Sequence, residues 1–243
     1  MTHTDRLVPG DTAPDILQVH DVTDDSVGGK AYGLSRLAGM GLRVPPAFVI
    51  RNARQGHYPA GLREAWAALG DYPVAVRSSA QGEDGADESF AGQYDTVLNV
   101  EGYDALLAAI DQCVASLYSE RAREYSARST CEPPAMNIVV QRMVNARAAG
   151  VVFTADPVSA RRGLLVIDAV EGLGEALVSG EATPDHFELG ENDRPLHTSI
   201  VGEAAVLSDE ELALIAGQAR RAEVREGHPL DLEWAIDTSG ELF

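Results

Sequence analysis

The sequence predicts an α+β fold with two lobes, because its two halves differ in pattern. The first half of the 243 residues mixes short apolar runs with amphipathic helical stretches. The second half has β-rich runs separated by Gly, Pro, Asn and Asp, then one helix and a last strand. With 45% hydrophobic residues, the chain can bury a substantial core. We expect one domain with approximate lobes at residues 1–136 and 137–243, and a ligand site in the cleft between them.

In the first lobe, hydrophobic spacing and helix breakers predict strands that alternate with helices. A helix within residues 27–46 is well marked, because Gly41 suits its C-terminal cap and Pro45–Pro46 forbid its continuation. Apolar residues three and four apart predict a long helix over residues 103–128. The remaining elements, in order, are strand 16–22, strand 47–50, helix 62–69, strand 74–77 and strand 94–100.

In the second lobe, strands are predicted from short β-rich runs bounded by turn residues. Ser208 and Glu211 form a capping box, which predicts a helix over residues 208–226. A strand at residues 230–237 follows, with its turn at 238–240. The β-rich runs that precede this helix cover residues 137–144, 149–157, 164–170, 185–190 and 196–202.

The charge of the chain narrows the classes of function. A formal net charge of −19 argues against nucleic acid, since neutralising phosphates needs clustered Lys and Arg, and against an anionic membrane surface. The N-terminus lacks the features of a signal peptide, and no apolar run approaches the roughly 18 residues of a membrane span. Cys113 and Cys131 have neither metal-site nor disulfide spacing. We therefore expect a cytoplasmic protein in which the few Lys and Arg residues are informative.

Several common catalytic motifs are missing from the sequence. Gly28-Gly29-Lys30 lacks the upstream glycine and the following hydroxyl residue of a P-loop. The run Gly172–Gly174 lacks the third glycine of a dinucleotide-binding loop. Neither H-E-x-x-H nor G-x-S-x-G occurs. Any chemistry must therefore come from residues that are dispersed along the chain.

Lys30 and Arg77 are candidate phosphate ligands. Lys30 lies at a predicted helix N-terminus, where a cation is poorly placed for helix stability unless an anion binds there. Arg77 ends a predicted strand, and a guanidinium can bind two phosphate oxygens at once. The loop beyond it contains Gly92, whose lack of a side chain lets backbone N–H groups approach phosphates. The simpler alternatives are a solvated lysine and an exposed turn with a surface salt bridge.

Two further groups of residues are candidate ligands, one for a metal ion and one for a purine base. Asp231 and Glu233 are two residues apart in a strand, so they project from one face, where Mg²⁺ could relieve their repulsion. They could equally be a pair on a solvent-exposed face. Gln141 ends an apolar strand, and its amide, or the backbone of Met143 or Val144, could recognise a purine edge; a solvated glutamine is the alternative. Cations, a glycine loop, an amide and a metal pair are the parts needed for phosphoryl transfer from a nucleotide.

Five segments, in this order, resemble the ATP-binding N-terminal domain of the phosphoenolpyruvate synthase, pyruvate phosphate dikinase and rifampicin phosphotransferase family. The resemblance covers most of residues 20–237. It implies an ATP-grasp fold with ATP between two lobes, Mg²⁺ as the metal, and transfer of a phosphoryl group to a histidine on a separate swivelling domain. The segments are VGGKAYGLSRLAGMGLRVPPAFVI, VAVRSSAQGEDGADESFAGQYDTVLNV, VVQRMVNARAAGVVFTADPV, DAVEGLGEALVSGEATPDHF and HPLDLEWAID.

The resemblance also implies roles for individual residues, and the departures from the family pattern leave alternative functions open. No histidine domain or barrel domain is expected within the chain, and the family's Gln-x-Arg-Pro segment is missing, so we expect a second polypeptide or further residues to complete the last strand. The alternatives to a histidine acceptor are a stand-alone kinase of a small molecule and a nucleotide-binding module without turnover. The implied roles are phosphate binding and catalysis for Lys30 and Arg77, a loop over the phosphates for Gly92 and Thr96, adenine recognition for Gln141, and metal binding for Asp231 and Glu233.

Overall fold

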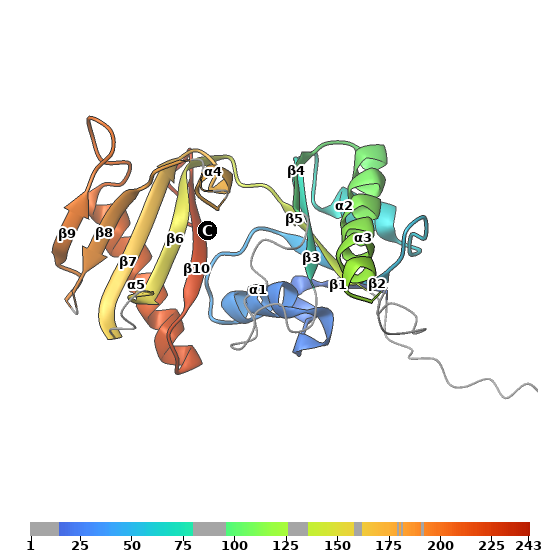
Figure 1. Cartoon of the computed structure of the whole chain (residues 1–243), viewed down its shortest axis with the longest axis horizontal. Helices are drawn as coiled ribbons and strands as arrows, with labels where there is room; N and C mark the ends of the chain where they lie inside the picture. The colour runs from blue at the N-terminus through green and yellow to red at the C-terminus, as the bar shows by residue number, and fades with distance from the viewer. Residues whose placement is uncertain are drawn as a thin grey trace, which may run out of the picture. The chain divides into compact units, whose positions relative to one another are not determined.

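The computed structural model describes residues 15–79, 96–125, 136–157, 162–178, 180, 182–190 and 192–243. It divides into two compact units, whose elements are labelled in Figure 1. The first unit takes Met1–Ser35 and Pro46–Met143, and the second takes Arg36–Pro45 and Val144–Phe243. The division therefore falls after residue 143, later than the lobe boundary expected at residue 136.

The first unit is built on an antiparallel five-stranded sheet, in the order β1-β2-β5-β3-β4. Helices α2 (Leu62–Ala68) and α3 (Tyr103–Tyr125) pack on one face of this sheet. The first turns of α1 (Gly29–Gly39) and two 3₁₀ turns, Val19–Asp21 and Asp25–Val27, pack on the other face. The strands are β1 (Ile16–Gln18), β2 (Ala47–Ala53), β3 (Val74–Ser79), β4 (Thr96–Val100) and β5 (Met136–Arg142).

Burial on both faces explains the unbroken apolar runs of the central strands. In β2, Phe48 and Ile50 belong to the core on the α2 and α3 side. Val49, between them, belongs to the cluster that contains Val27 and Ala31 on the other side. A strand covered on both faces needs apolar residues at every position, because successive side chains point to opposite faces.

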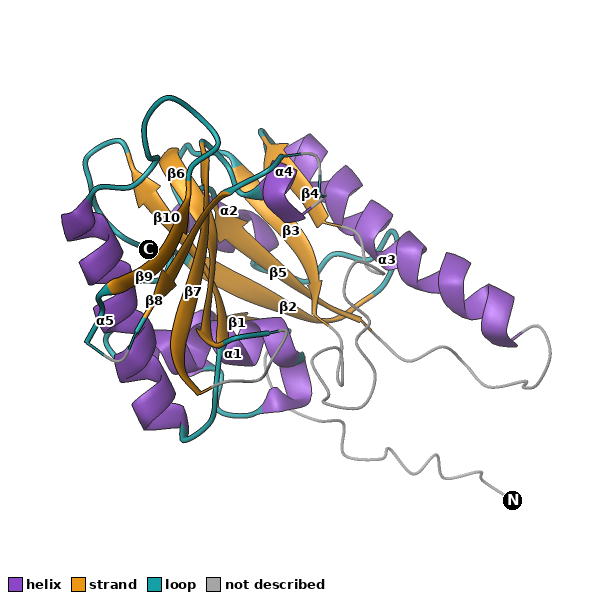
Figure 2. Ribbon diagram, turned by 60° about the vertical axis from the view of Figure 1, so that its left-hand side comes forward, coloured by secondary structure: helices purple, strands orange, loops and turns teal. Residues whose placement is uncertain are grey.

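The second unit is also built on an antiparallel five-stranded sheet, in the order β10-β6-β7-β8-β9. Helix α5 (Asp209–Glu226) packs on one face of it (Figure 2), through residues that include Leu212 and Ile215. A short helix, α4 (Glu175–Val178), follows β7. The strands are β6 (Ala146–Ala155), β7 (Arg162–Glu171), β8 (Asp185–Leu189), β9 (Pro195–Ser199) and β10 (Asp231–Asp237).

The α+β prediction is confirmed, because each antiparallel sheet has helices packed on a face. The predicted capping box of α5 is also present, with Ser208 accepting from the Glu211 N–H and Glu211 accepting from the Ser208 N–H. The strand predicted at residues 16–22 is shorter, because residues 19–21 turn as a 3₁₀ helix. Strand β5, expected in the second lobe, instead pairs between β2 and β3 in the first sheet. The short helix α4 was not predicted.

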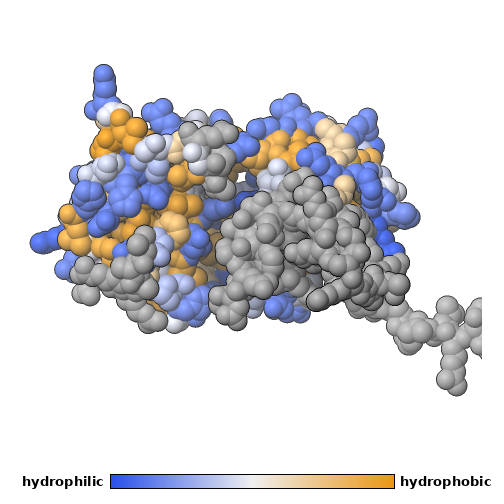
Figure 3. All heavy atoms as spheres, viewed as in Figure 1, coloured by the Kyte–Doolittle hydropathy of each residue, from blue (hydrophilic) through white to orange (hydrophobic). Residues whose placement is uncertain are grey.

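The described surface is mixed in polarity. In Figure 3, hydrophilic and hydrophobic residues alternate over the described part of the second unit. Exposed apolar side chains around β9 include Leu196 and Val201. Among the described residues, no helix is long and apolar enough to cross a membrane.

Candidate functional site

The loop before Lys30 is held tightly against the end of β3. The Ser79 hydroxyl donates to the Val27 carbonyl over 2.8 Å and accepts from the Ala31 N–H over 3.2 Å. Gly28 has φ +91°, and a Cβ at this position would lie 2.4 Å from Ser79 atoms. Glycine is therefore required both by the backbone conformation and by the close approach of the two segments. The consequence is that the first turn of α1, which contains Lys30, is fixed to the strand that contains Arg77.

Arg77 and Thr96 project from the face of the first sheet on which α1 packs. Arg77 lies directly opposite Val139 of β5 and Thr96 of β4. Val139 belongs to the apolar cluster that contains Ala31 of α1, and directly opposed residues project from the same face. The side chain of Thr96 is exposed and that of Arg77 is partly buried. Thr96 thus begins β4 beside Arg77, in agreement with the strand predicted over residues 94–100, whereas the resemblance had assigned it to the loop over the phosphates.

Gln141 lies on this same face, two residues beyond Val139 in β5. It sits opposite Ala47 and Ala75, and only 8% of it is exposed. A glutamine that ends a strand would ordinarily be solvated, so its burial disfavours the simpler alternative for this position. The first unit therefore brings the α1 start with Lys30, together with Arg77, Thr96 and Gln141, to one face of one sheet.

The backbone after Gln141 is partly committed to hydrogen bonds within the protein. The Met143 N–H donates to the Pro73 carbonyl over 2.9 Å. The Val144 carbonyl accepts from the Ala146 N–H over 2.8 Å. The Met143 N–H is therefore engaged, which leaves the Met143 carbonyl and the Val144 N–H as the better candidates for a purine edge.

In the second unit, Asp231 and Glu233 lie on the face of β10 that is turned away from α5. Trp234 and Ile236, which alternate with them, belong to the core under α5. Both carboxylate residues are exposed. The predicted common face is thus present, and exposure is compatible both with a cation between the carboxylates and with a solvated pair.

The same face carries an acid–histidine pair that the sequence did not reveal. Glu233 lies opposite Val151, Val151 opposite Asp168, and Asp168 opposite His186. His186 Nδ1 is 2.7 Å from Asp168 Oδ1, and the side chains are 34% and 22% exposed. Alternation within β7 and β8 could have placed each residue on a face, but their contact depends on the register between the strands.

The donor set of the proposed metal site is small. Among the described residues, no group of three or more His, Cys, Asp or Glu side chains could hold a metal ion. Mg²⁺ does not need such a cage, because it binds through one or two carboxylates and completes its shell with waters and substrate phosphates. Asp231 and Glu233 fit that donor set.

Comparison with known proteins identifies the family. The profile described as "Pyruvate phosphate dikinase, AMP/ATP-binding domain" matches residues 57–206. The chain belongs to this family. It is 36% identical over 266 residues to the prodigiosin synthesizing transferase PigC of Serratia marcescens, covering 86% of this chain and 30% of PigC. It is 41% identical over 190 residues to a rifampicin phosphotransferase of a Streptomyces species, covering 68% of this chain and 22% of that protein.

A third relative extends the comparison to the synthases. A probable phosphoenolpyruvate synthase of Archaeoglobus fulgidus is 38% identical over 195 residues, which is 70% of this chain and 26% of that protein. The chain thus spans less than a third of the length of each of these relatives. Membership of the pyruvate phosphate dikinase family, together with the two antiparallel sheets, bears out the predicted α+β, ATP-grasp class.

The site residues predicted for this pyruvate phosphate dikinase family member are distributed over both units. Those of the first unit lie on one sheet face or at its margin. In the second unit, Asp231 and Glu233 share one face of β10, whereas Val144 lies just before β6. Gly92 lies outside the described residues. The first group is Lys30, Arg77, Thr96, Gln141 and Met143, and the second is Val144, Asp231 and Glu233.

Proposed function

We propose that this chain binds Mg-ATP and transfers a phosphoryl group from it to a histidine on a separate partner domain. Membership of an AMP/ATP-binding domain family supports nucleotide binding. The observation that carries the proposal is the grouping of the α1 start, Arg77, Thr96 and Gln141 on one face of the first sheet. Two cationic residues, a hydroxyl and a buried amide are a combination suited to a nucleotide with a charged tail.

Each residue has a role that follows from its chemistry. Arg77 projects from a paired strand, which fixes its backbone, and its planar guanidinium can bind phosphate oxygens through two N–H groups. Lys30 adds a second positive charge, next to the N–H groups that begin α1. The Gln141 amide can both donate to and accept from a purine edge. Mg²⁺ bound by Asp231 and Glu233 would neutralise phosphate charge.

The proposed transfer step requires little covalent chemistry from this chain. An imidazole nitrogen of the partner's histidine attacks phosphorus, and the bond from phosphorus to the bridging oxygen of the nucleotide breaks. The leaving nucleotide keeps that oxygen and its electron pair. Lys30 and Arg77 stabilise the negative charge that develops on the phosphoryl oxygens, because fixed positive groups do not have to reorganise during the reaction.

Binding is tested by calorimetric titration with ATP and Mg²⁺. We expect Arg77→Ala and Glu233→Ala each to weaken binding by roughly 10- to 100-fold, the range for losing a hydrogen bond to a charged group. Arg54→Ala and Glu210→Ala are matched controls, because both residues are exposed and neither belongs to the proposed site. Equal affinities in all five proteins would refute the site.

Transfer is tested separately, with labelled ATP and a histidine-bearing domain added as a second polypeptide. The proposal expects consumption of ATP only when that domain is present, and an acid-labile, base-stable label on its histidine. Consumption with a small acceptor alone would instead identify a stand-alone kinase. Binding without consumption under every pairing would identify a nucleotide-binding module.

A further inference from the structure

Two histidines and two carboxylates gather on one face of the second sheet. They belong to β7, β8 and β9, which are neighbours in the sheet (Figure 1). In β8, Phe187 and Leu189 alternate with two of these residues and belong to the core under α5, so the polar side chains project from the opposite face. The other two lie directly opposite them in the register and share that face. We call these four residues the β8 cluster: Asp168, His186, Glu188 and His197.

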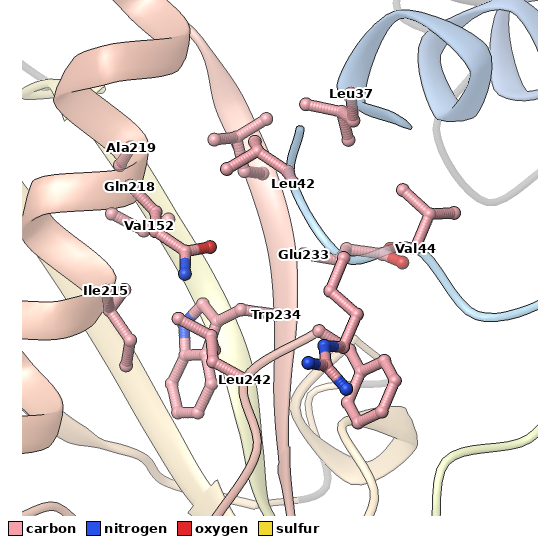
Figure 4. Close-up of a pocket in the computed structure, with 13 residues that line it drawn as sticks. Leu37, Leu42, Val44, Val152, Ile215, Gln218, Ala219, Glu233, Trp234 and Leu242 are labelled. Carbon is pink, nitrogen blue, oxygen red and sulfur yellow. The ribbon is translucent and has the colours of Figure 1, made fainter. Parts of the chain in front are cut away.

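The β8 cluster is separate from the proposed nucleotide site. Glu233 lies in β10, three strands away from β8 in the sheet, which is roughly 14 Å at about 4.8 Å per strand. None of the cluster residues lines the cavity between α5 and β10 (Figure 4). A ligand of the cluster therefore needs no residue that the nucleotide site uses.

The negative charges of the cluster are not balanced within the protein. Asp168 and Glu188 both face His186, and among the described residues neither carboxylate forms an ion pair with a Lys or Arg side chain. Even a protonated imidazole would leave one negative charge between them. The three side chains are only 22–36% exposed, so water screens this charge incompletely. The cluster therefore attracts a cation.

The hydrogen bond to Asp168 sets the orientation of the His186 ring. His186 Nδ1 is 2.7 Å from Asp168 Oδ1. An ionised carboxylate only accepts, so Nδ1 is the donor, and the neutral ring then carries its lone pair on Nε2. A carboxylate that holds a histidine in this way is the usual partner of a metal-binding histidine, because it fixes the tautomer and the ring orientation.

The Nε2 lone pair faces an oxygen at the separation of two metal ligands. Zinc lies about 2.0–2.1 Å from an imidazole nitrogen and about 2.0–2.2 Å from a carboxylate oxygen, so tetrahedral geometry separates the two ligand atoms by about 3.4 Å. His186 Nε2 and Glu188 Oε1 are 3.6 Å apart. This distance is too long for a hydrogen bond but leaves room for an ion between the two atoms.

We propose that the β8 cluster binds a divalent transition metal ion of the Zn²⁺ class. His186 Nε2 and Glu188 Oε1 are the two ligands already in place, in keeping with the absence of a ready group of three or more among the described residues. His197 is the third, because it is exposed, lies opposite Glu188 and has its ring centroid 6.2 Å from that of His186. Water completes the shell.

The nature of the ligands separates this ion from the Mg²⁺ of the proposed nucleotide site. Imidazole nitrogen suits Zn²⁺, whereas Mg²⁺ prefers oxygen ligands. The bound ion would also join β9, the edge strand of the second sheet, to β8 through side chains.

The test follows the imidazole ¹⁵N resonances of the full chain while Zn²⁺ is added in the presence of excess Mg²⁺. We expect the resonances of His186 and His197 to move together and to saturate at equimolar Zn²⁺. His228 is the internal control, because it is an exposed histidine of the same unit that faces a carboxylate of Glu226 at 3.9 Å, but its Nδ1 lies 2.9 Å from a carbonyl oxygen instead of a second carboxylate. Its resonances should stay in place.

Substitutions divide the cluster into its parts. His186→Gln should abolish the saturable binding of Zn²⁺. Asp168→Asn removes the orienting carboxylate and should weaken binding by roughly 10- to 100-fold. Asp231→Asn should leave the Zn²⁺ affinity unchanged, because this residue lies in β10 and outside the cluster.

The native titration decides by itself if these variants fail to fold. The proposal is overturned if Zn²⁺ at millimolar concentration moves no histidine in a saturable way, or if it moves all exposed histidines alike. It is also overturned if a folded His186→Gln chain binds Zn²⁺ as the native chain does, or if Asp231→Asn abolishes the binding.

Discussion

Replacing Gly28 by alanine tests the contact that fixes the start of α1 to β3. Gly28 has φ 91° and ψ 159°, a region that residues with a Cβ essentially do not occupy, at a cost of about 1–3 kcal/mol. The new Cβ would also lie 2.4 Å from the Ser79 backbone and hydroxyl, and such overpacking costs about 1–3 kcal/mol more. We expect Gly28→Ala to destabilise the first unit by about 4 kcal/mol.

Gly33→Ala is the matched control, because Gly33 lies in the helix that follows Gly28 and, apart from the backbone of that helix, no atom of the described residues lies within 4 Å of a methyl group added there. Alanine in a helix interior is favoured over glycine by about 0.5–1 kcal/mol, so this change should stabilise the unit slightly. The two substitutions add the same methyl group and are expected to have opposite signs.

The assay is urea unfolding followed by the Trp66 indole resonance, which reports on the first unit separately from Trp234. Urea slopes of about 1–3 kcal/mol per molar predict that Gly28→Ala lowers the midpoint by at least about 1 M, and that Gly33→Ala raises it by a few tenths. A Gly28→Ala midpoint equal to that of the native chain would show that α1 is not held against Ser79.

Three other changes have defined outcomes. Gly150→Ala would place a Cβ 1.8 Å from the Asp168 carbonyl oxygen, so the folded Trp234 resonance should be lost while that of Trp66 persists. Ser208→Ala should lower the stability of the second unit by about 1 kcal/mol through loss of the helix cap, and Ser208→Gly by only a few tenths, measured as urea midpoints. The hydrogen bond that Tyr58 donates to Asp111 raises the pKa of Tyr58 to about 12, so absorbance at 295 nm should show a late tyrosine ionisation that Tyr58→Phe removes. Because this pKa is raised on folding, the associated stability is complete below about pH 10 and is lost as the pH rises through 12.

Much of the fold was predictable because its signals are local. The capping box at Ser208, the breakers after α1 and the alternation in β10 depend on residues that are close in sequence. The shared face of Asp231 and Glu233 was predictable for the same reason, since strand residues two apart project together.

The arrangement of the first sheet was not predictable from local patterns. Val139 could be assigned to a strand, but not to the strand that pairs with both β2 and β3. That pairing is what places Arg77 and Gln141 on one face and extends the first unit to residue 143. The contact between Asp168 and His186 depends in the same way on the register of β7 and β8.

The assignment of residues 36–45 to the second unit has a practical consequence for protein engineering. A polypeptide that begins at Val144 would contain every strand of the second sheet but would lack Leu37, Leu42 and Val44. Water would then reach apolar side chains of α5 and β10 that these three residues adjoin. Separate expression of the second unit therefore calls for a fusion that restores this ten-residue piece, and a simple cut after Met143 should give an aggregation-prone fragment.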